Sequence, residues 1–161
     1  MTTYPINPAE RVQRRICSIL ESDLITLPEF TGFVARNGRE FQQEKYPFFS
    51  VQVTENQEVF PGINVWNVNF TVAMVEDRQE ANTTLGTDPR PRHELRAENA
   101  SARLFGQWNG LTLPDAINAI IDGNGVQVLK MSGTNQANGT MSEDELSTEY
   151  SFTLCCTSSQ Q

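Results

Sequence analysis

The stretch Trp66-Asn-Val-Asn-Phe-Thr-Val-Ala-Met74 alternates strictly between large apolar residues and polar or small ones. Successive side chains of a strand point to opposite faces, so this alternation places all the large apolar side chains on one face. A strand of this kind is typical of a sheet that is covered on one face only. The stretch therefore predicts a long strand over residues 63–76 and a sheet with helices packed against one side.

The segments on either side of this strand supply its neighbours. Apolar residues alternate with polar ones over residues 47–54, and Pro61-Gly62 marks a turn, so the two strands are expected to form an antiparallel hairpin. After a charged loop over residues 76–92, further strands are expected over residues 126–131 and from Leu146 to Cys156. These four strands are expected to form one mainly antiparallel sheet.

Three helices complete the predicted order α-β-β-α-α-β-β. Pro8 suits the first turn of a helix that ends near Ser22, and further helices are expected over residues 91–108 and 114–122. The order favours an α+β fold with helices on one face of a four-stranded sheet. Residues 1–161 are expected to form a single domain, with long loops over residues 24–46 and 132–145 and a frayed tail over 157–161. A short hairpin around residues 33–41 fits the turn signal inside the first loop.

Composition excludes several classes of protein. The 161 residues carry a net charge of −8, which disfavours general binding of nucleic acid. The beginning of the sequence lacks the features of a signal peptide, and no apolar run is long enough to cross a membrane. Cys17, Cys155 and Cys156 do not read as a disulfide framework, so we expect buried free thiols in a reducing cytoplasm.

No catalytic or metal-binding constellation is recognisable. His93 is the single histidine, and we expect it to be exposed at the start of a helix. The carboxylates fall in loops and on polar faces, where we expect them to be solvated, and none has calcium-loop spacing. The carboxylates in question are Glu76, Asp77, Glu94, Glu98, Asp115, Asp122, Glu143, Asp144 and Glu145. The sequence therefore predicts no enzyme, no metal and no cofactor.

Two basic clusters stand out in this acidic chain. Arg11, Arg14 and Arg15 share one face of the first predicted helix, and a second cluster surrounds the loop into the second helix. The second cluster consists of Arg78, Arg90, Arg92 and Arg96. A solvated helix face is the plain interpretation of the first cluster. The alternative is that both clusters contact acidic stretches such as Glu143-Asp144-Glu145 on another copy of the chain.

Three segments resemble the tail-terminator and tail-completion proteins of long-tailed bacteriophages. Pro47-Phe-Phe-Ser-Val-Gln-Val-Thr-Glu55 resembles the first strand of that family. Trp66-Asn-Val-Asn-Phe-Thr-Val-Ala-Met-Val-Glu-Asp77 resembles its long second strand, and Tyr150-Ser-Phe-Thr-Leu-Cys-Cys156 its last strand. These motifs are patterns of residue class. Together with the order of helices and strands, the likeness spans most of the chain apart from the loops over residues 24–46 and 132–145.

The resemblance implies a structural virion protein that is assembled in the host cytoplasm. Such proteins form a homo-oligomeric ring, commonly a hexamer, that ends the tail tube and joins it to the connector proteins of the head. DNA passes through the lumen as cargo, and an acidic lumen repels phosphate. Two alternatives stay open: a cytoplasmic module that binds a peptide or small ligand without catalysis, and a small enzyme that uses carboxylates.

Overall fold

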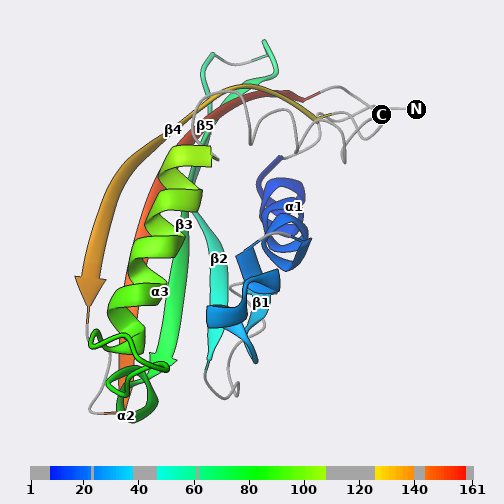
Figure 1. Ribbon diagram of the computed structural model, residues 1–161. Coiled ribbons are helices and arrows are strands. Elements are labelled where there is room, and N and C mark those ends of the chain that lie inside the picture. Colours follow the sequence, from blue (N-terminus) through cyan, green and yellow to red (C-terminus); the bar gives the residue numbers. More distant parts are fainter. Residues whose placement is uncertain are drawn as a thin grey trace.

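The alternating stretch forms β3 (Val65–Asp77), which lies between two antiparallel neighbours, β2 (Phe48–Glu58) and β5 (Glu145–Ser158). Figure 1 shows the computed structural model, which describes residues 8–22, 24–37, 47–60, 62–107, 126–139 and 144–158. Two outer strands complete a five-stranded sheet in the order β1-β2-β3-β5-β4. β1 (Val34–Asn37) is parallel to β2, and β4 (Val126–Gly139) is antiparallel to β5.

The predicted α+β class is confirmed, with one strand more than expected. The four predicted strands correspond to β2, β3, β4 and β5, and their pairings with one another are all antiparallel. β1 falls within residues 33–41, where we predicted a short hairpin. Its residues instead pair in parallel with the beginning of β2, which makes the sheet mixed. A parallel strand cannot be inferred from a local turn signal, because its partner is not its neighbour across a tight turn.

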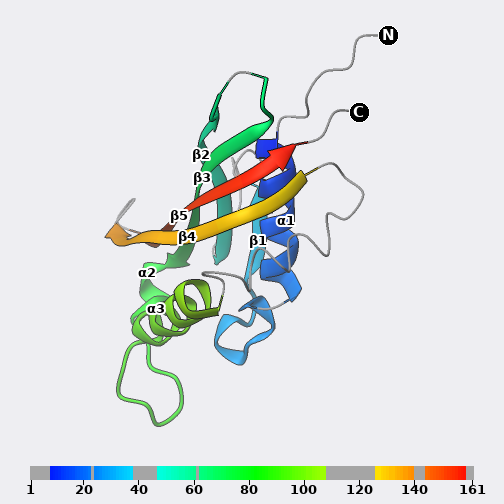
Figure 2. The same cartoon turned by 90° about the horizontal axis from the view of Figure 1, so that it is seen from above.

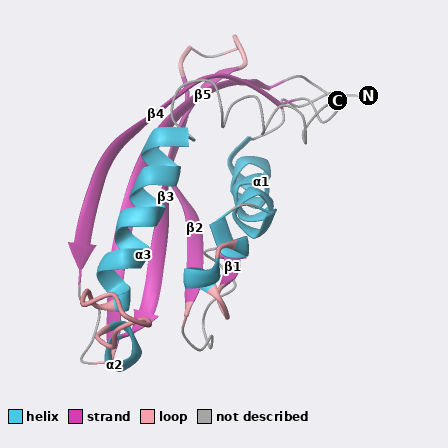
Figure 3. Cartoon of the chain, viewed as in Figure 1, coloured by secondary structure: helices cyan, strands magenta, loops and turns pink. Residues whose placement is uncertain are grey.

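The helices cover one face of the sheet, as Figures 2 and 3 show from two directions. α1 (Pro8–Ser22) confirms the first predicted helix, and α3 (Arg92–Ser101) continues into a π-helical turn, Ala102–Gln107, over most of the second. The predicted helix over residues 114–122 lies outside the described residues. Shorter helical segments are η1 (Leu24–Thr26) and η2 (Pro28–Phe30) in the first predicted loop, and α2 (Arg78–Ala81) in the charged loop.

The predicted polar loop over residues 132–145 and the predicted frayed tail over residues 157–161 were wrong in part. Residues 132–139 belong to β4 and residue 145 begins β5, so most of the expected polar loop is a continuation of a hairpin. Polar residues can extend a hairpin because the pairing is made by backbone groups, which every residue but proline carries. β5 also includes Thr157 and Ser158, which we expected in the frayed tail.

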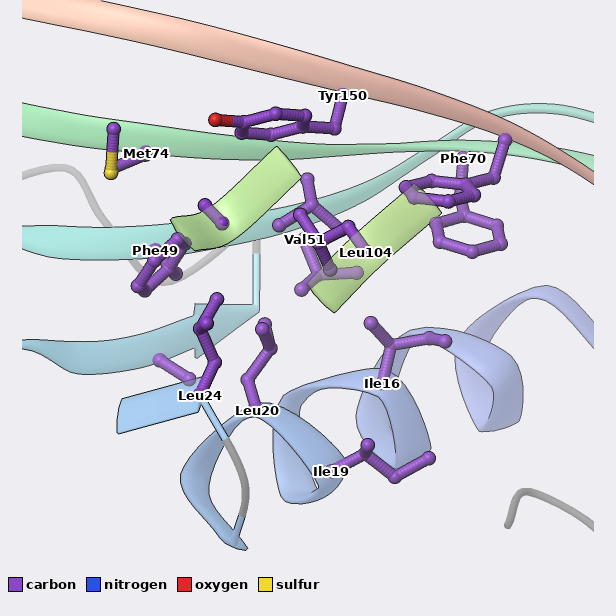
Figure 4. Packing of buried hydrophobic residues seen from close by; sticks show 14 of the residues in the cluster. Ile16, Ile19, Leu20, Leu24, Phe49, Val51, Phe70, Met74, Leu104 and Tyr150 are labelled. Carbon is purple, nitrogen blue, oxygen red and sulfur yellow. The ribbon is translucent and has the colours of Figure 1, made fainter. Parts of the chain in front are cut away.

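The core lies between the sheet and the helices (Figure 4). Val68, Phe70, Val72 and Met74 of β3 are buried there, as predicted, while Trp66 is only partly buried against the same cluster. The Phe70 and Phe152 rings of adjacent strands are stacked, with centroids 5.1 Å apart. α1 contributes Val12, Ile16, Ile19 and Leu20 to this core, and α3 with its π-helical turn contributes Ala100 and Leu104.

The three cysteines are free. Cys156 is buried in the core, which confirms the prediction for that residue, whereas Cys17 and Cys155 are only half-buried. Burial, with a smaller effect of neighbouring Cys155, raises the pKa of the Cys156 thiol to about 12. Cys156 is therefore an inert core residue at neutral pH.

Candidate subunit-contact surface

A buried charge cluster fixes the end of the molecule where β3, α2 and α3 meet. Glu76 and Arg96 are almost completely inaccessible, with exposed fractions of 0% and 3%. Arg96 Nη1 donates to Glu76 Oε1 at 3.0 Å, and both terminal nitrogens donate to the Glu80 carboxylate at 2.8 and 2.7 Å. Arg96 Nε donates to the carbonyl of Glu29 at 2.9 Å. One guanidinium thus joins β3, α2, α3 and η2.

The same cluster holds His93. Its Nδ1 lies 2.6 Å from Glu76 Oε2, and since a carboxylate only accepts, Nδ1 is the donor. The expectation that His93 is exposed and Glu76 solvated is therefore wrong. Glu76 continues the alternation of Phe70, Val72 and Met74, so its side chain points to the covered face. Within the described residues Glu76 is the hydrogen-bond partner of His93.

The charges of the cluster compensate one another. Hydrogen bonds from Arg96 hold the pKa of Glu80 below its usual value, against the opposing effect of burial. Burial by itself lowers the pKa of Arg96, but its bonds to Glu80 and Glu76 outweigh that effect and raise it. The pKa of Tyr150 is raised by burial and by the nearby charge of Glu76. The cluster is thus a satisfied structural network that fastens the helices to the sheet.

At the opposite end, the β2–β3 hairpin extends beyond the helices (Figures 1 and 2). We call residues 54–69 the hairpin arm. β1 pairs only with Phe48 to Val51, so the rest of β2 is an open edge within the described residues, apart from Val53, whose N–H donates to Gln13 Oε1 at 3.0 Å. A bulge at Thr54 marks the place where the arm leaves the packed part of the sheet.

Backbone hydrogen bonds close the end of the arm. Ile63 N–H donates to the carbonyl of Phe60 at 3.2 Å, and Gly62 has a φ of 85°, which a type II turn requires at that position. Asn64 also has positive φ, and its N–H donates to Glu58 Oε1 at 3.1 Å. These bonds join the two sides of the arm beside the apolar residues at its end.

The turn presents apolar side chains to solvent. Val59, Phe60 and Ile63, which we call the tip, are 40%, 61% and 56% exposed. Three other large apolar residues of the described chain are exposed, and they are scattered: Val34, Leu85 and Leu129. Clustered apolar exposure at the end of a hairpin is typical of a surface that binds another protein. No signal in the periodicity of the sequence marked the tip, because an apolar turn cannot be told from an apolar strand end.

The first basic cluster lies on the outer face of α1. Arg14 is exposed and pairs with Glu10 at 2.7 Å, one helical turn earlier. Arg11 and Arg15 are half-buried, and among the described residues neither has an ion-pair partner. Arg11 Nη1 is buried without a hydrogen-bond partner in that part of the chain. Two arginines of the predicted contact set thus carry uncompensated charge.

The second cluster is used within the chain. Arg90 is paired with Asp88 and with Glu98, and Arg92 lies 3.7 Å from Glu80. Arg78 lies beside the acidic stretch of its own chain, since the backbone N–H of Arg78 donates to the backbone carbonyl of Asp144 at 2.9 Å. Asp144 is exposed, Glu145 is half-buried, and Glu143 lies outside the described residues. Arg90, Arg92 and Arg96 thus have acidic partners in the same copy, whereas in the first cluster no described acidic residue pairs with Arg11 or Arg15.

Other kinds of site find no support in the described part of the chain. No group of three or more histidine, cysteine, aspartate or glutamate residues there is placed to hold a metal ion. None of its helices combines the length and the apolar character that crossing a membrane requires. No protein-family model matches the sequence, and no curated protein matches it either.

Proposed function

We propose that the chain is a structural subunit of a tailed bacteriophage, in which copies assemble into a ring that ends the tail tube and joins it to the connector of the head. The observation that carries the proposal is the hairpin arm with its exposed apolar tip, at the opposite end of the molecule from the buried charge cluster. A projecting apolar knob suits a head-to-tail contact between identical copies, which is the kind of contact that generates rings.

The segments that carry the resemblance to tail-terminator proteins support this proposal by their positions. The first two form the β2–β3 hairpin, and the third forms β5 on the other side of β3. The chain is acidic, with a net charge of −8, so a ring of such subunits repels the DNA that passes through it. Tube and connector proteins are the further partners of such a ring.

The deciding experiment is an image of the assembled particle. Electron cryomicroscopy of particles that carry a tagged copy of the chain is expected to show several tags around the tail axis, where the tube meets the head. Deletion of the gene is expected to leave heads and tails unjoined. One copy per particle, or a position away from the axis, overturns the proposal. Monomers in dilute solution do not, because the tube raises the effective concentration of the subunits.

A peptide-binding module is the second candidate, and one observation favours it. β4 is a 14-residue edge strand whose sequence contains a single charged residue, Lys130, and no proline. Long edge strands with few charged residues and no proline accept an added strand from another chain. Protection of β4 amides from hydrogen exchange on adding a peptide, with no assembly in particles, would favour this function over the ring.

A further inference from the structure

The hairpin arm has a charge as well as an apolar tip. Residues 54–69 include two glutamates, Glu55 and Glu58, and no lysine or arginine. Glu58 Oε1 accepts from the backbone of Asn64, and Glu55 Oε2 accepts from the Asn69 side chain at 3.0 Å. Neither glutamate faces a cation among the described residues. The arm is therefore an apolar knob with a negative rim, and its natural receptor is an apolar surface with a positive rim.

On α1 the half-buried side chains of Arg11 and Arg15 offer this chemistry, with their stems as the apolar part and their guanidinium groups as the positive part, whereas the exposed residues of the helix are polar. The pairing of Arg14 with Glu10 leaves Arg11 and Arg15 as two positive charges without described partners, against two negative charges on the arm. Half-buried arginines cover apolar surface with their aliphatic stems. Their guanidinium groups also stack on aromatic faces, so they can receive the Phe60 ring.

We infer that the tip of one copy docks on the outer face of α1 of a second copy, with Phe60 against the arginine side chains and Glu55 and Glu58 opposite Arg11 and Arg15. The contact joins two different surfaces of the same chain, so in a pair one copy keeps a free receptor and the other keeps a free knob. It rests on the proposed function in that such a head-to-tail contact is what closes the ring. It also assigns the first basic cluster an acidic partner other than Glu143-Asp144-Glu145.

The contact can be mapped directly. The photo-cross-linker p-benzoylphenylalanine replaces Phe60, and unlabelled protein is mixed with ¹⁵N-labelled protein, both at high concentration and in assembled particles. After irradiation we expect cross-linked peptides of mixed isotope content that join the tip to α1. A cross-link to another part of the second copy or to another protein overturns the inference, as does the absence of any cross-link in both samples.

Charge exchange tests the proposed pairing. Arg15→Glu alone and Glu55→Arg alone are each expected to lower the yield of the tip-to-α1 cross-link, and the two together to restore it. Glu149→Arg, which reverses an exposed glutamate on β5, is the matched control and should leave the yield unchanged. Failure of the double variant to recover the yield refutes the charge pairing.

Truncation of the tip tests the apolar part of the contact. Phe60→Ser is expected to weaken self-association, measured by sedimentation velocity in concentrated solution, by about tenfold or more, as for other aromatic anchors. Leu85→Ser removes another exposed apolar residue (40%), from the segment between α2 and α3, and should have no effect. If the two variants associate equally well, the tip is not the docking element.

The two proposals fail in different ways. Cross-links between tip and α1 that never extend beyond two copies support the contact and contradict the ring. Rings seen on the tail axis together with cross-links from position 60 to other surfaces keep the ring and overturn the contact.

Discussion

Replacing Arg96 with methionine tests whether the buried charge cluster stabilises the fold through compensated charge. The substitution keeps an apolar chain of similar length but removes every bond of the guanidinium, which leaves the fully buried Glu76 with His93 as its hydrogen-bond partner. Breaking a buried ion pair by removing one partner costs about 3–5 kcal/mol. The loss of stacking on Phe33, whose ring centroid lies 5.0 Å from the guanidinium carbon, adds to that cost.

Urea denaturation measures the free energy of unfolding and heating measures the Tm, both followed by circular dichroism. A loss of about 3–5 kcal/mol corresponds to a decrease in Tm of roughly 6–20 °C for a chain of this size. The control is the double variant Arg96→Met with Glu76→Leu, in which the buried charge is removed along with its partner. It is expected to recover much of the lost stability, because apolar replacements of a buried pair are often neutral. A loss below about 1 kcal/mol in the single variant, or no recovery in the double, would refute the reasoning.

The same variant also predicts a dependence on pH. Arg96 holds the pKa of Glu80 below its unfolded value, so the ionised carboxylate contributes stability above pH about 4.5 that is lost as the pH falls further. The difference in unfolding free energy between wild type and Arg96→Met should therefore shrink as the pH falls below about 4.5. A difference that stays constant down to pH 3 would contradict this account.

Three shorter predictions concern single side chains. Phe70→Ala is expected to lower the free energy of unfolding by about 3–5 kcal/mol, since the ring is buried and stacked; a loss well under 1 kcal/mol would mean that β3 is not core. His93→Ala leaves a buried oxygen of Glu76 without its bond, so chemical denaturation should show a loss of about 1–3 kcal/mol with the fold retained, and an unchanged midpoint would be inconsistent with the bond. Alkylation of the folded protein at pH 8, read by mass spectrometry, should modify Cys155 but spare Cys156, whose pKa is raised to about 12; equal labelling would contradict that burial.

The alternation around Phe70 predicts the sheet and its covered face because the period of a strand ties sequence directly to direction. The buried charge cluster was missed because its members come from separate elements, and polarity alone assigned Glu76 and His93 to solvent. A signal was nevertheless present. Glu76 lies in phase with Met74 on β3, and Arg96 lies four residues before the buried Ala100 on α3.

Other features lie beyond local pattern. β1 pairs in parallel with a strand that does not follow it across a tight turn, so no turn motif in the sequence indicates the pairing. The extension of β4 past Met131 has no apolar alternation to reveal it. Of the predicted contact residues, the arginines of α1 were placed on their helix face by the period of the helix. Whether Arg90 and Arg92 were free could not be known, because their partners Glu98 and Glu80 are set by the packing of α3 against α2.

The position of β5 has a consequence for how the chain acquires its structure. β5 lies between β3 and β4, and its register joins Phe70 to Phe152 and Asp77 to Glu145. The centre of the sheet therefore closes only after the ribosome has released residues 145–158, and β4 has no neighbour until then. Such non-local pairing is expected to make folding slow, in milliseconds to seconds. Nascent chains would expose the apolar face of β3 until β5 has emerged, which makes them substrates for chaperones of the cell that produces them.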